Sequence, residues 1–313
     1  MPQDVNRRAA AARHFCTRRD NSLPSLPTHT QPAADNAPPT GITVSIIILT
    51  WNSQAEIAAC LSSLDHGLRT FSSEVIVIDN GSQDATCTIV RETLPRVQLV
   101  CNDANRGVAP ARNQGLDLAQ GKYVLVLDDD TVVQPGAFDC LINYLENHLD
   151  VGLCGPKLID GAGQLQLSCR LFPTLADKLV RRLSLPAAQK ISQAVEMADW
   201  DHSTVRDVDY VIGACQAIRR SAVAAVGPYD ERIFYGPEDV DLCLRLQQAG
   251  WRVVYQPEAV VVHRERRLTR SLRSGIGWKH VRGLSYFFWK HGYLLSRRRV
   301  YARLARDQGQ AAA

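Results

Sequence analysis

YVLVLDDDT, the stretch at residues 123–131, joins a short apolar run to three consecutive carboxylates. The apolar run is rich in β-branched and aromatic residues, and this composition predicts a buried strand of a parallel sheet. Asp128, Asp129 and Asp130 follow at the carboxyl end of that strand, where open α/β sheets bind their ligands. Because adjacent carboxylates repel one another, they need a counter-charge such as a hard divalent cation. The alternative, an acidic turn that caps a helix opening near Pro135, stays open from this motif alone.

The composition is that of a globular protein with a substantial core. The chain has 313 residues, of which 45% are hydrophobic and 22% charged, and this length suits one large α/β domain with additions. No apolar run approaches the roughly 20 residues that a membrane-spanning helix needs. The 9 cysteines occur singly, without a CxxC pair. Their pattern argues against a zinc site and a disulfide framework, and it predicts a reducing, cytoplasmic location.

Three further apolar segments precede the Asp-rich strand, and each is followed by polar residues. The predicted strands cover residues 43–49, 74–78 and 97–101, with predicted amphipathic helices between them. Ser53 and Glu56 predict a capping box at the start of the first helix. The alternation predicts an α/β fold whose doubly wound, mostly parallel sheet carries helices on both faces. The polar clusters should therefore meet along one edge of the sheet as a binding crevice.

Two common phosphate-binding motifs are absent from the sequence. No GxGxxG follows the first predicted strand, and no GxxxxGK[ST] occurs. The sequence therefore offers neither the dinucleotide fingerprint nor a P-loop. We expect a nucleotide diphosphate bound at this edge to be neutralised by a metal ion on the aspartates instead.

A second group of carboxylates opens a predicted helix after Pro237. Glu238 and Asp239 fall in its first turn, and Gly250 ends it. One interpretation is that these carboxylates only complement the positive end of the helix dipole, a contribution of about 0.3 to 1 kcal/mol each. The other makes one of them a general base. Residues 160–207, which precede this helix, have a weaker pattern, and we interpret them as an insertion that shapes an acceptor pocket.

Together these segments resemble the family-2 glycosyltransferases, in particular the rhamnosyltransferase-like branch. The resemblance rests on six stretches in the family's order, which span most of residues 41–292. They are SIIILTWN (45–52), VIVIDNGSQD (75–84), NRGVAPARNQGL (105–116), YVLVLDDDT (123–131), GACQAIRRSAVAAVGPYDERIFYGPEDVDLCLRLQQAGWRVVYQPEAVVVH (213–263) and SYFFWKHG (285–292). The resemblance implies a single GT-A domain with two abutting Rossmann-like halves. Such a domain transfers a sugar from a nucleotide-diphosphate donor to an acceptor hydroxyl with inversion.

The resemblance also implies which residues contact the donor. They are Thr50, Asn52, Asp79, Asn105, Arg112, Asp128 and Asp129. The first three would hold the base and the ribose of the nucleotide. Arg112, from the ARNxG part of the third stretch, would face the nucleotide as well.

A metal site and a catalytic base are implied in the same way. Asp130 would bind Mg²⁺ or Mn²⁺ directly, and Asp128 would contact the ribose or a metal-bound water. His263 would be a third metal contact or a contact to the diphosphate; the alternative is a structural histidine at the end of a strand. The ion would neutralise the charge that grows on the leaving diphosphate. Asp239, with Glu238 beside it, would take the proton of the acceptor hydroxyl.

The sequence departs from the family pattern in two places. His263 is followed by Arg264, Glu265 and two further arginines instead of small residues and a serine. No QxxRW follows the predicted helix, which argues against a processive, polymer-extruding synthase. The implied donor is a nucleotide sugar such as dTDP-rhamnose, and the implied acceptor is a glycan or a lipid-linked glycan in polysaccharide or cell-wall assembly. The alternatives are a nucleotidyltransferase on a similar sheet and a non-catalytic nucleotide-sugar-binding module.

The sequence predicts three regions along the chain. Residues 1–40 are polar and proline-rich, and we expect a disordered N-terminal tail. Residues 41–263 form the predicted GT-A domain, with a nucleotide-binding part at 41–131 and an acceptor-side part at 132–263. The last region, 264–313, is a predicted basic, amphipathic helical extension.

This C-terminal region differs in charge from the rest of the chain. Between residues 264 and 306, 13 Lys and Arg stand against 1 acid, a net charge of 13 − 1 = +12, which leaves 4 − 12 = −8 for the remaining chain. Apolar and small residues recur among these charges at near-helical spacing: Trp278, Val281, Ser285, Phe288 and Leu295. Such a helix suits peripheral contact with an anionic membrane surface, at the inner face of the plasma membrane; the alternative is a helix packed on the core with a solvated basic face. We expect no nucleic-acid partner, because no known binding motif accompanies the charge.

Overall fold

The computed structural model describes residues 41–180, 186–265 and 275–311. The predicted disordered tail over residues 1–40 lies outside the described residues. The first half of the chain contains β1 (Val44–Thr50), α2 (Ile57–Gly67), β2 (Ser73–Asp79), α3 (Thr86–Thr93), β3 (Gln98–Cys101), α4 (Val108–Leu118), β4 (Tyr123–Asp128), β5 (Thr131–Val133) and α5 (Ala137–Asn147). The second half contains β6 (Val151–Ile159), β7 (Leu165–Gln166), β8 (Cys169–Arg170), α6 (Leu175–Val180), α7 (Pro186–Val195), β9 (Arg206–Asp207), β10 (Tyr210–Val211), β11 (Cys215–Arg219), α8 (Arg220–Val226), α9 (Glu238–Gln248), β12 (Arg252–His263), α10 (Gly275–His291) and α11 (Arg298–Ala311).

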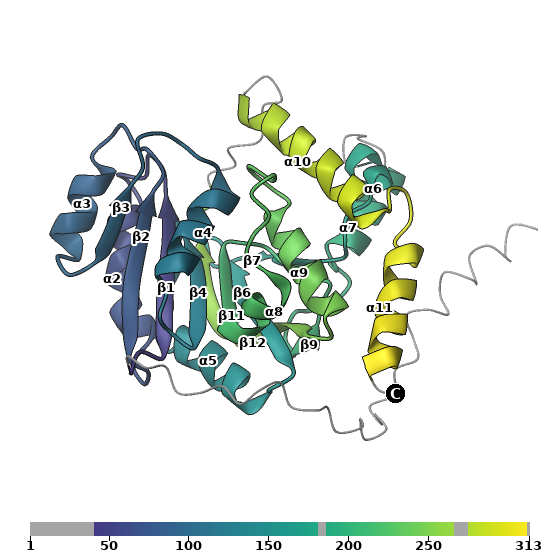
Figure 1. Cartoon of the computed structure of the whole chain (residues 1–313), viewed down its shortest axis with the longest axis horizontal. Coiled ribbons are helices and arrows are strands. Elements are labelled where there is room, and N and C mark those ends of the chain that lie inside the picture. Colours follow the sequence, from purple (N-terminus) through teal and green to yellow (C-terminus); the bar gives the residue numbers. More distant parts are fainter. Residues whose placement is uncertain (1–40, 181–185, 266–274, 312–313) are drawn as a thin grey trace, which may run out of the picture.

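One mixed sheet forms the centre of the molecule, in the strand order β3-β2-β1-β4-β11-β6-β12-β5 (Figure 1). The strands β3, β2, β1 and β4 pair in parallel, and so do β6 and β12. Between these two groups lies β11, which pairs antiparallel with β4 and with β6. The predicted α/β class with a mostly parallel sheet is confirmed, and the two parallel groups are joined through an antiparallel strand.

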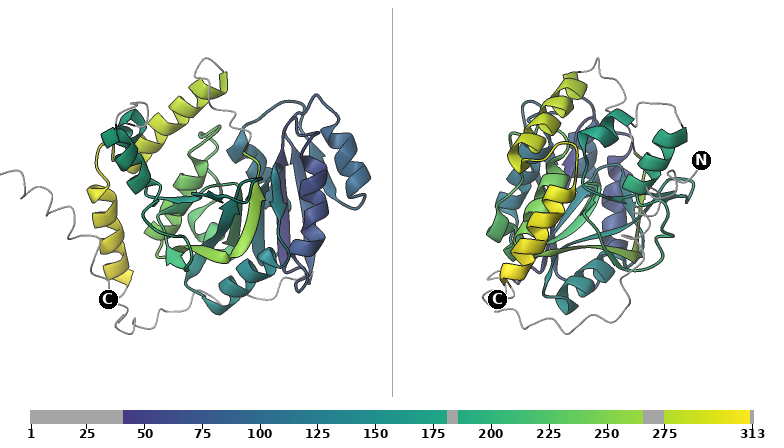
Figure 2. Two further views of the ribbon diagram at one scale, coloured as in Figure 1. Left: turned by 180° about the vertical axis from the view of Figure 1, so that it is seen from behind. Right: turned by 90° about the vertical axis from the view of Figure 1, so that its right-hand side faces the viewer.

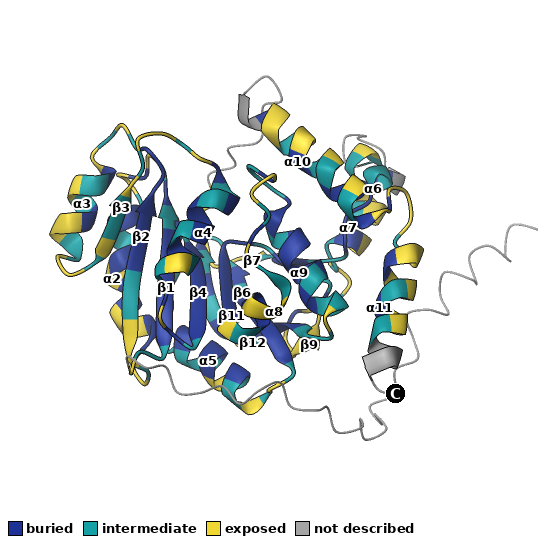
Figure 3. Ribbon diagram, viewed as in Figure 1, coloured by how far each residue is buried: buried dark blue, intermediate teal, exposed yellow. Residues whose placement is uncertain are grey.

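Helices cover both faces of the sheet (Figure 2), because its strands are apolar on both sides. Along β1, Ile46 and Ile48 face the core cluster that includes α2 and α5, whereas Ile47 faces the cluster that includes α4 and α9. None of the three is more than 1% exposed, and burying each side chain contributes about 1.5–3 kcal/mol. Figure 3 shows the buried residues concentrated in the sheet and on the inward sides of the helices. This two-sided burial is the reason that the strands read as continuous apolar runs.

The carboxyl ends of the parallel strands lie side by side at one edge of the sheet. Thr50 is paired with Asp79 in the ladder, and Leu49 is paired with Asp128. At the end of β12, His263 pairs with Thr131 of β5, directly after the three aspartates. The loops after β1, β2 and β4 therefore gather their polar residues at one crevice, as the sequence predicts.

The predicted capping box at the first helix is wrong. The helix α2 begins at Ile57, and Glu56 precedes it without a side-chain capping bond. The Ser53 amide donates instead to Thr86 Oγ1 at 2.8 Å, and Ser53 Oγ has no hydrogen-bond partner within the described residues. The Glu56 carboxylate lies 3.2 Å from Arg264 Nη1. Contacts between distant segments thus replace the local cap, and residue spacing alone does not reveal them.

The chain ends in two helices that pack on the side of the sheet that carries α4 and α9. Phe287 and Phe288 of α10 and Leu304 of α11 belong to the core cluster on that side. Trp278 and Trp289 of α10 are 72% and 75% exposed. The core-packing alternative therefore holds for the inner side of α10, while its outer side exposes these tryptophans beside basic residues such as Arg282. Within the described ranges, no helix is long and apolar enough to cross a membrane.

Arg219, at the end of β11, is 1% exposed and holds together the turn between α5 and β6. Its guanidinium donates to the carbonyl oxygens of Leu145, His148 and Val151 and to the Tyr123 hydroxyl. A buried polar group left without its partner costs about 1–3 kcal/mol. Arg219 therefore allows several backbone carbonyl groups to be buried beneath the sheet.

Replacing Arg219 by Met keeps a long side chain and removes every donor. We expect Arg219→Met to lower the free energy of unfolding by about 3 kcal/mol, measured by urea denaturation. Arg220→Met is the matched control, because Arg220 is exposed and donates to the Gln120 carbonyl at the surface. Equal losses in the two variants would contradict the role given to Arg219.

Candidate functional site

A cleft of about 270 Å³ opens at the carboxyl edge of the sheet. It is walled by the ends of β1, β4 and β12, by α4 and by the start of α9. Nine of the 11 residues that the sequence predicts for the site line this cleft: Thr50, Asn105, Arg112, Asp128, Asp129, Asp130, Glu238, Asp239 and His263. The structure places Asn52 and Asp79 outside the lining.

Arg112, in the middle of α4, joins the two groups of carboxylates. Its Nη2 donates to Asp128 Oδ1 at 2.9 Å and to the Gly213 carbonyl at 2.8 Å, and its Nη1 donates to Glu238 Oε1 at 3.1 Å. Burial disfavours the charge on Arg112, but the acids around it, Asp128 first, outweigh this effect and raise the pKa of the guanidinium. Arg112 therefore stays charged and neutralises acids from both the sheet edge and α9. The sequence predicts a contact with the nucleotide; the structure shows these internal ion pairs.

Asp128, Asp130 and His263 form a compact group whose ligand atoms lie within 4.8 Å of one another. His263 Nε2 is 3.4 Å from Asp130 Oδ1. Burial disfavours a charge on His263, but the hydrogen bond to Asp130 and the charges of Asp130 and Asp128 outweigh it and raise the pKa of the imidazole. Two carboxylates and one imidazole are a donor set that suits a divalent cation.

Gln166 of β7 fixes the His263 ring from its other side. The Gln166 amide nitrogen donates to the His263 carbonyl at 2.8 Å, and Gln166 Oε1 lies 2.9 Å from His263 Nδ1. Because an amide oxygen only accepts hydrogen bonds, Nδ1 carries a proton and Nε2 is turned toward the carboxylates. Sequence analysis missed Gln166, since a two-residue strand outside every recognised motif offers no signal.

The middle aspartate has a different task from its two neighbours. Asp129 is 2% exposed, and its Oδ2 accepts the Trp51 amide at 3.2 Å. For Asp128, burial and the charge of Asp130 outweigh the stabilising charges of Arg112 and His263 and raise the pKa of the carboxyl group. Of the three aspartates, Asp128 and Asp130 therefore lie beside His263, and Asp129 anchors the loop after β1.

Glu238 and Asp239 open α9 in contrasting surroundings. Glu238 is 6% exposed, and burial together with the charge of Asp239 raises its pKa to about 7 against the opposing charge of Arg112. Its Oε2 has no hydrogen-bond partner within the described residues. Asp239 is half-buried at the cleft wall, where its Oδ2 accepts the Gly213 amide at 3.0 Å. One carboxyl group of α9 is therefore easily protonated, and its neighbour is held by a backbone donor beside the cleft.

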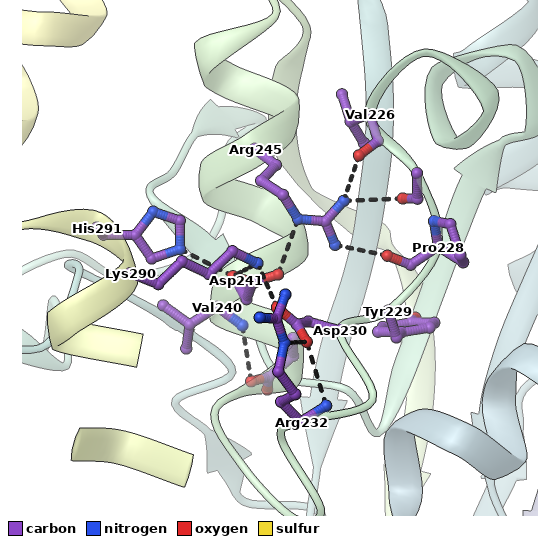
Figure 4. A network of polar contacts seen from close by, with 12 residues as sticks. Val226, Pro228, Tyr229, Asp230, Arg232, Val240, Asp241, Arg245, Lys290 and His291 are labelled. Carbon is purple, nitrogen blue, oxygen red and sulfur yellow. Dashed lines mark hydrogen bonds and ion pairs between the residues drawn. The ribbon is translucent and has the colours of Figure 1, made fainter. Parts of the chain in front are cut away.

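A buried carboxylate fixes α9 from behind. Asp241 is 0% exposed, and Arg245, Lys290 and His291 converge on it at 2.8, 2.7 and 2.8 Å (Figure 4). Burial disfavours its charge, but the hydrogen bond to His291 and the charges of Arg245 and Lys290 outweigh this and lower the pKa of Asp241. Because Lys290 and His291 belong to α10, one carboxylate links α10 to the helix that carries Glu238.

Two buried oxygens at the ends of β1 and β2 lack hydrogen-bond partners in the described part of the chain, Thr50 Oγ1 and Asp79 Oδ1. The other oxygen of Asp79 accepts the Ser82 amide at 2.9 Å. Asn80, which sequence analysis did not single out although it adjoins Asp79, donates to Asn105 Oδ1 at 3.2 Å and so positions that loop. Since buried unpaired oxygens are costly, Thr50 and Asp79 are suited to accept hydrogen bonds from a ligand.

The structure also brings two cysteines together beside Asp79. Cys87 Sγ and Cys101 Sγ are 3.1 Å apart, and with Asp79 they form a second group whose ligand atoms lie within 4.8 Å of one another. Burial, the contact with Cys101 and the charge of Asp79 raise the pKa of Cys87 to about 12. The absence of a CxxC pair gave no hint of this contact, because the two thiols come from α3 and β3.

Known proteins share both the sequence pattern and the fold of this chain. The family model described as "Glycosyl transferase family 2" matches residues 45–227. An N-acetylglucosaminyl-diphospho-decaprenol L-rhamnosyltransferase from Mycobacterium tuberculosis is 30% identical over 231 residues, which cover 70% of this chain and 75% of that protein.

Two solved structures extend the comparison to the fold. GalNAc-T7 with UDP, GalNAc and Mn²⁺ superposes with a TM-score of 0.58 at 16% identity, covering 79% of this chain and 48% of that one. The mannosyltransferase PcManGT from Pyrobaculum calidifontis, in complex with GDP-Man and Mn²⁺, gives a TM-score of 0.55 at 20% identity, covering 90% of this chain and 70% of that one. At these identities the likeness concerns the fold, and it confirms the predicted GT-A fold.

The raised pKa of Glu238 predicts a pH-dependent contribution to stability. Its pKa rises from 4.5 to about 7 in the folded chain, so between these values the folded state binds more protons than the unfolded state. The free energy of unfolding should therefore fall as pH rises through this window. Glu238→Gln, which is neutral at every pH, should remove that component, measured as the midpoint of thermal unfolding from pH 4.5 to 7.5.

Glu92→Gln, at an exposed position of α3, is the control for the loss of one carboxyl group. Its profile should follow that of the unaltered chain. If the Glu238→Gln profile runs parallel to the unaltered one across the whole window, the buried carboxyl group is not the source of the pH dependence.

Proposed function

The chain belongs to glycosyl transferase family 2, and we propose that it is a metal-dependent, inverting enzyme that moves a sugar from a nucleoside diphosphate to an acceptor hydroxyl. The observation that carries the proposal is a single cleft in which the group of Asp128, Asp130 and His263 shares the lining with Glu238 and Asp239. Stabilising a leaving diphosphate and activating an attacking hydroxyl require these two kinds of group around one reacting carbon.

Asp239 is the general base in this proposal. The Gly213 amide holds its Oδ2 at 3.0 Å beside the cleft, where it would take the proton of the acceptor hydroxyl. Glu238 is paired with Arg112, and a pKa of about 7 leaves much of it protonated near neutral pH, which suits a positioning role. A single displacement that needs a base and no protein nucleophile inverts the configuration at the anomeric carbon.

The residues for a divalent metal are Asp128, Asp130 and His263, and their surroundings support this role. Arg112 orients Asp128, and Gln166 holds the His263 ring with Nε2 toward Asp130. Oxygen ligands suit both Mg²⁺ and Mn²⁺, and the imidazole nitrogen shifts the preference toward Mn²⁺. When bound, the ion supplies Lewis-acid stabilisation of the leaving diphosphate.

For the substrates, we propose an L-rhamnosyl donor and a lipid-linked glycan acceptor in cell-wall or polysaccharide assembly. The support is the rhamnosyltransferase relative, whose name contains both the sugar and a lipid-linked acceptor. Thr50 and Asp79 would accept hydrogen bonds from the nucleotide. A lipid-linked acceptor would bring the enzyme to a membrane surface. The alternative of a nucleotidyltransferase finds no support in the family match.

The proposal is tested by measuring binding and turnover of a panel of nucleotide sugars, including dTDP-rhamnose, with Mn²⁺, Mg²⁺ or EDTA. We expect one donor to bind with Mn²⁺ and to be released by EDTA. Asp239→Asn should keep donor affinity but lose turnover by about 10²–10⁴-fold, because it removes the general base. Asp130→Asn should lose the Mn²⁺-dependent part of donor binding.

Asp117→Asn, at an exposed position of α4, is the control for these two variants and should resemble the unaltered enzyme. Failure of every nucleotide sugar to bind under all metal conditions would refute the proposal. Normal turnover by Asp239→Asn would refute the base assignment. Donor binding without hydrolysis or transfer in any condition would instead favour the non-catalytic binding module.

The contact between Gln166 and His263 leads to a separate expectation about the metal. Gln166→Leu should weaken Mn²⁺ affinity by about 10–100-fold, because the ring of His263 loses the partner that orients it. The free Mn²⁺ concentration in a titration, read by electron paramagnetic resonance, measures this change. Gln164→Leu is the matched control, since the Gln164 side chain is exposed in the turn before β7; an equal effect in both variants would count against the assignment.

A further inference from the structure

The helix α10 carries an apolar stripe on the side that faces away from the core. Trp278, Val281 and Trp289 form it, with the small residue Ser285 between them; the four follow one another at intervals of three or four residues and are all exposed. At this spacing they lie on one side of the helix, while Phe287 points into the core at 0% exposure. A surface helix normally keeps its outward side polar. Two tryptophans at 72% and 75% exposure therefore indicate a side that meets an apolar partner.

A groove of about 570 Å³ runs between α10 and α6 and reaches the segment after α10. Its apolar lining includes Leu175, Leu179, Leu284, Phe288, Trp289 and Leu294. Its walls are tied together, because the Leu175 amide donates to the Leu294 carbonyl at 2.8 Å and Arg297 pairs with Asp177 at 2.5 Å. With Leu179 and Leu294 at 55% and 47% exposure, the groove is an apolar surface open to solvent, and its volume lies in the range of small-molecule sites.

The charge around the groove selects the kind of partner. From residue 278 to 306 the sequence holds 8 Lys and Arg and no Asp or Glu, and Arg282, Arg298 and Arg299 are exposed. A second copy of this chain docked through the same surface would bring like charges together, which is unfavourable. An anionic lipid surface instead attracts these side chains, and each one raises the affinity of the protein for the membrane by about fivefold.

The stripe adjoins the cleft. On the neighbouring side of α10, His280 Nδ1 lies 3.3 Å from the Tyr235 carbonyl oxygen, and Lys279 Nζ lies 3.6 Å from the centroid of the Phe234 ring. Both Phe234 and Tyr235 line the cleft. The contacts of α10 with Asp241 fix the helix to α9 (Figure 4), so a partner bound on the stripe would have a defined position relative to the site.

We propose that the stripe and the groove seat the enzyme on an anionic lipid bilayer, with Trp278 and Trp289 at the boundary between headgroups and acyl chains. Tryptophan suits this boundary because it combines a large apolar body with a polar N–H group. The exposed arginines face the headgroups, and the groove receives an acyl chain. The inference rests on the proposed function in one respect: a lipid-linked acceptor would reach the cleft along α10 without leaving the bilayer.

Co-sedimentation of the full chain with vesicles tests this inference. We expect binding to vesicles of phosphatidylcholine mixed with phosphatidylglycerol, little binding to phosphatidylcholine alone, and release at high salt. The double variant Trp278→Ala/Trp289→Ala should bind at least about tenfold more weakly, because it loses apolar area at the boundary. Arg282→Gln combined with Arg299→Gln should weaken binding by about fivefold for each charge.

Two controls accompany these variants. Leu149→Ala removes an apolar side chain that is 59% exposed in the turn between α5 and β6, and Arg96→Gln removes an exposed cation before β3; both should bind vesicles as the unaltered enzyme does. Tryptophan fluorescence should be quenched by brominated lipid in the unaltered enzyme and much less in the double variant. The inference fails if the unaltered enzyme does not bind anionic vesicles or if the double variant binds equally well. It fails too if light scattering shows a dimer that only the tryptophan variant dissociates.

Failure here is distinguishable from failure of the proposed function. Mn²⁺-dependent donor binding in solution should be the same in the double tryptophan variant and the unaltered enzyme, since the substitutions lie outside the cleft. Vesicle binding without any donor binding would refute the proposed enzymatic function and would still support the inference that α10 binds the membrane. Donor turnover without vesicle binding would support the proposed function and refute the inference that α10 binds the membrane.

Discussion

Repulsion among carboxylates at one edge of the sheet is the constraint on which the rest of the structure depends. Asp128 from β4 and Glu238 from α9 line the same cleft, where the side chain of Glu238 is 8% exposed and that of Asp128 is 35% exposed. Charges in such a place are tolerated only when they are paired, and Arg112 bonds to both. The helix α4 must therefore approach β4 and α9 together. Gly213 makes room for this approach, because a Cβ there would lie 2.6 Å from Arg112 Nη1.

The surroundings of each acid set its task more than its residue type does. Glu238 and Asp241 lie one turn apart on α9, yet burial beside Asp239 raises the pKa of Glu238 while His291, Arg245 and Lys290 lower that of Asp241. The first is ready to hold a proton near the cleft. The second remains a carboxylate and anchors the helix. Two carboxyl groups one turn apart on α9 therefore differ in how readily they bind a proton, because their neighbours differ.

The helix α10 connects regions that are distant in the sequence. Phe287 packs in the core, His291 joins α9 through Asp241, and His280 contacts the loop that borders the cleft. The same helix turns Trp278 outward. A helix with apolar residues on two sides can bury only one of them against its own core. The other side is then available for a partner. Because this side of α10 lies beside the cleft, a partner bound there would lie close to the cleft as well.

The sequence by itself determined the class of the fold, because the strand period, the helix period and the position of loops after parallel strands are local or topological rules. Its resemblance to a known family then indicated nine of the residues that line the cleft. The tertiary structure alone decided the pairing of Arg112 with two acids, the support of His263 by Gln166, the replacement of the predicted cap at Ser53 and the contact between Cys87 and Cys101. These features join segments that are far apart in the chain. Their geometry depends on how whole elements pack, and packing distances between side chains have no counterpart in the spacing of residues along a sequence.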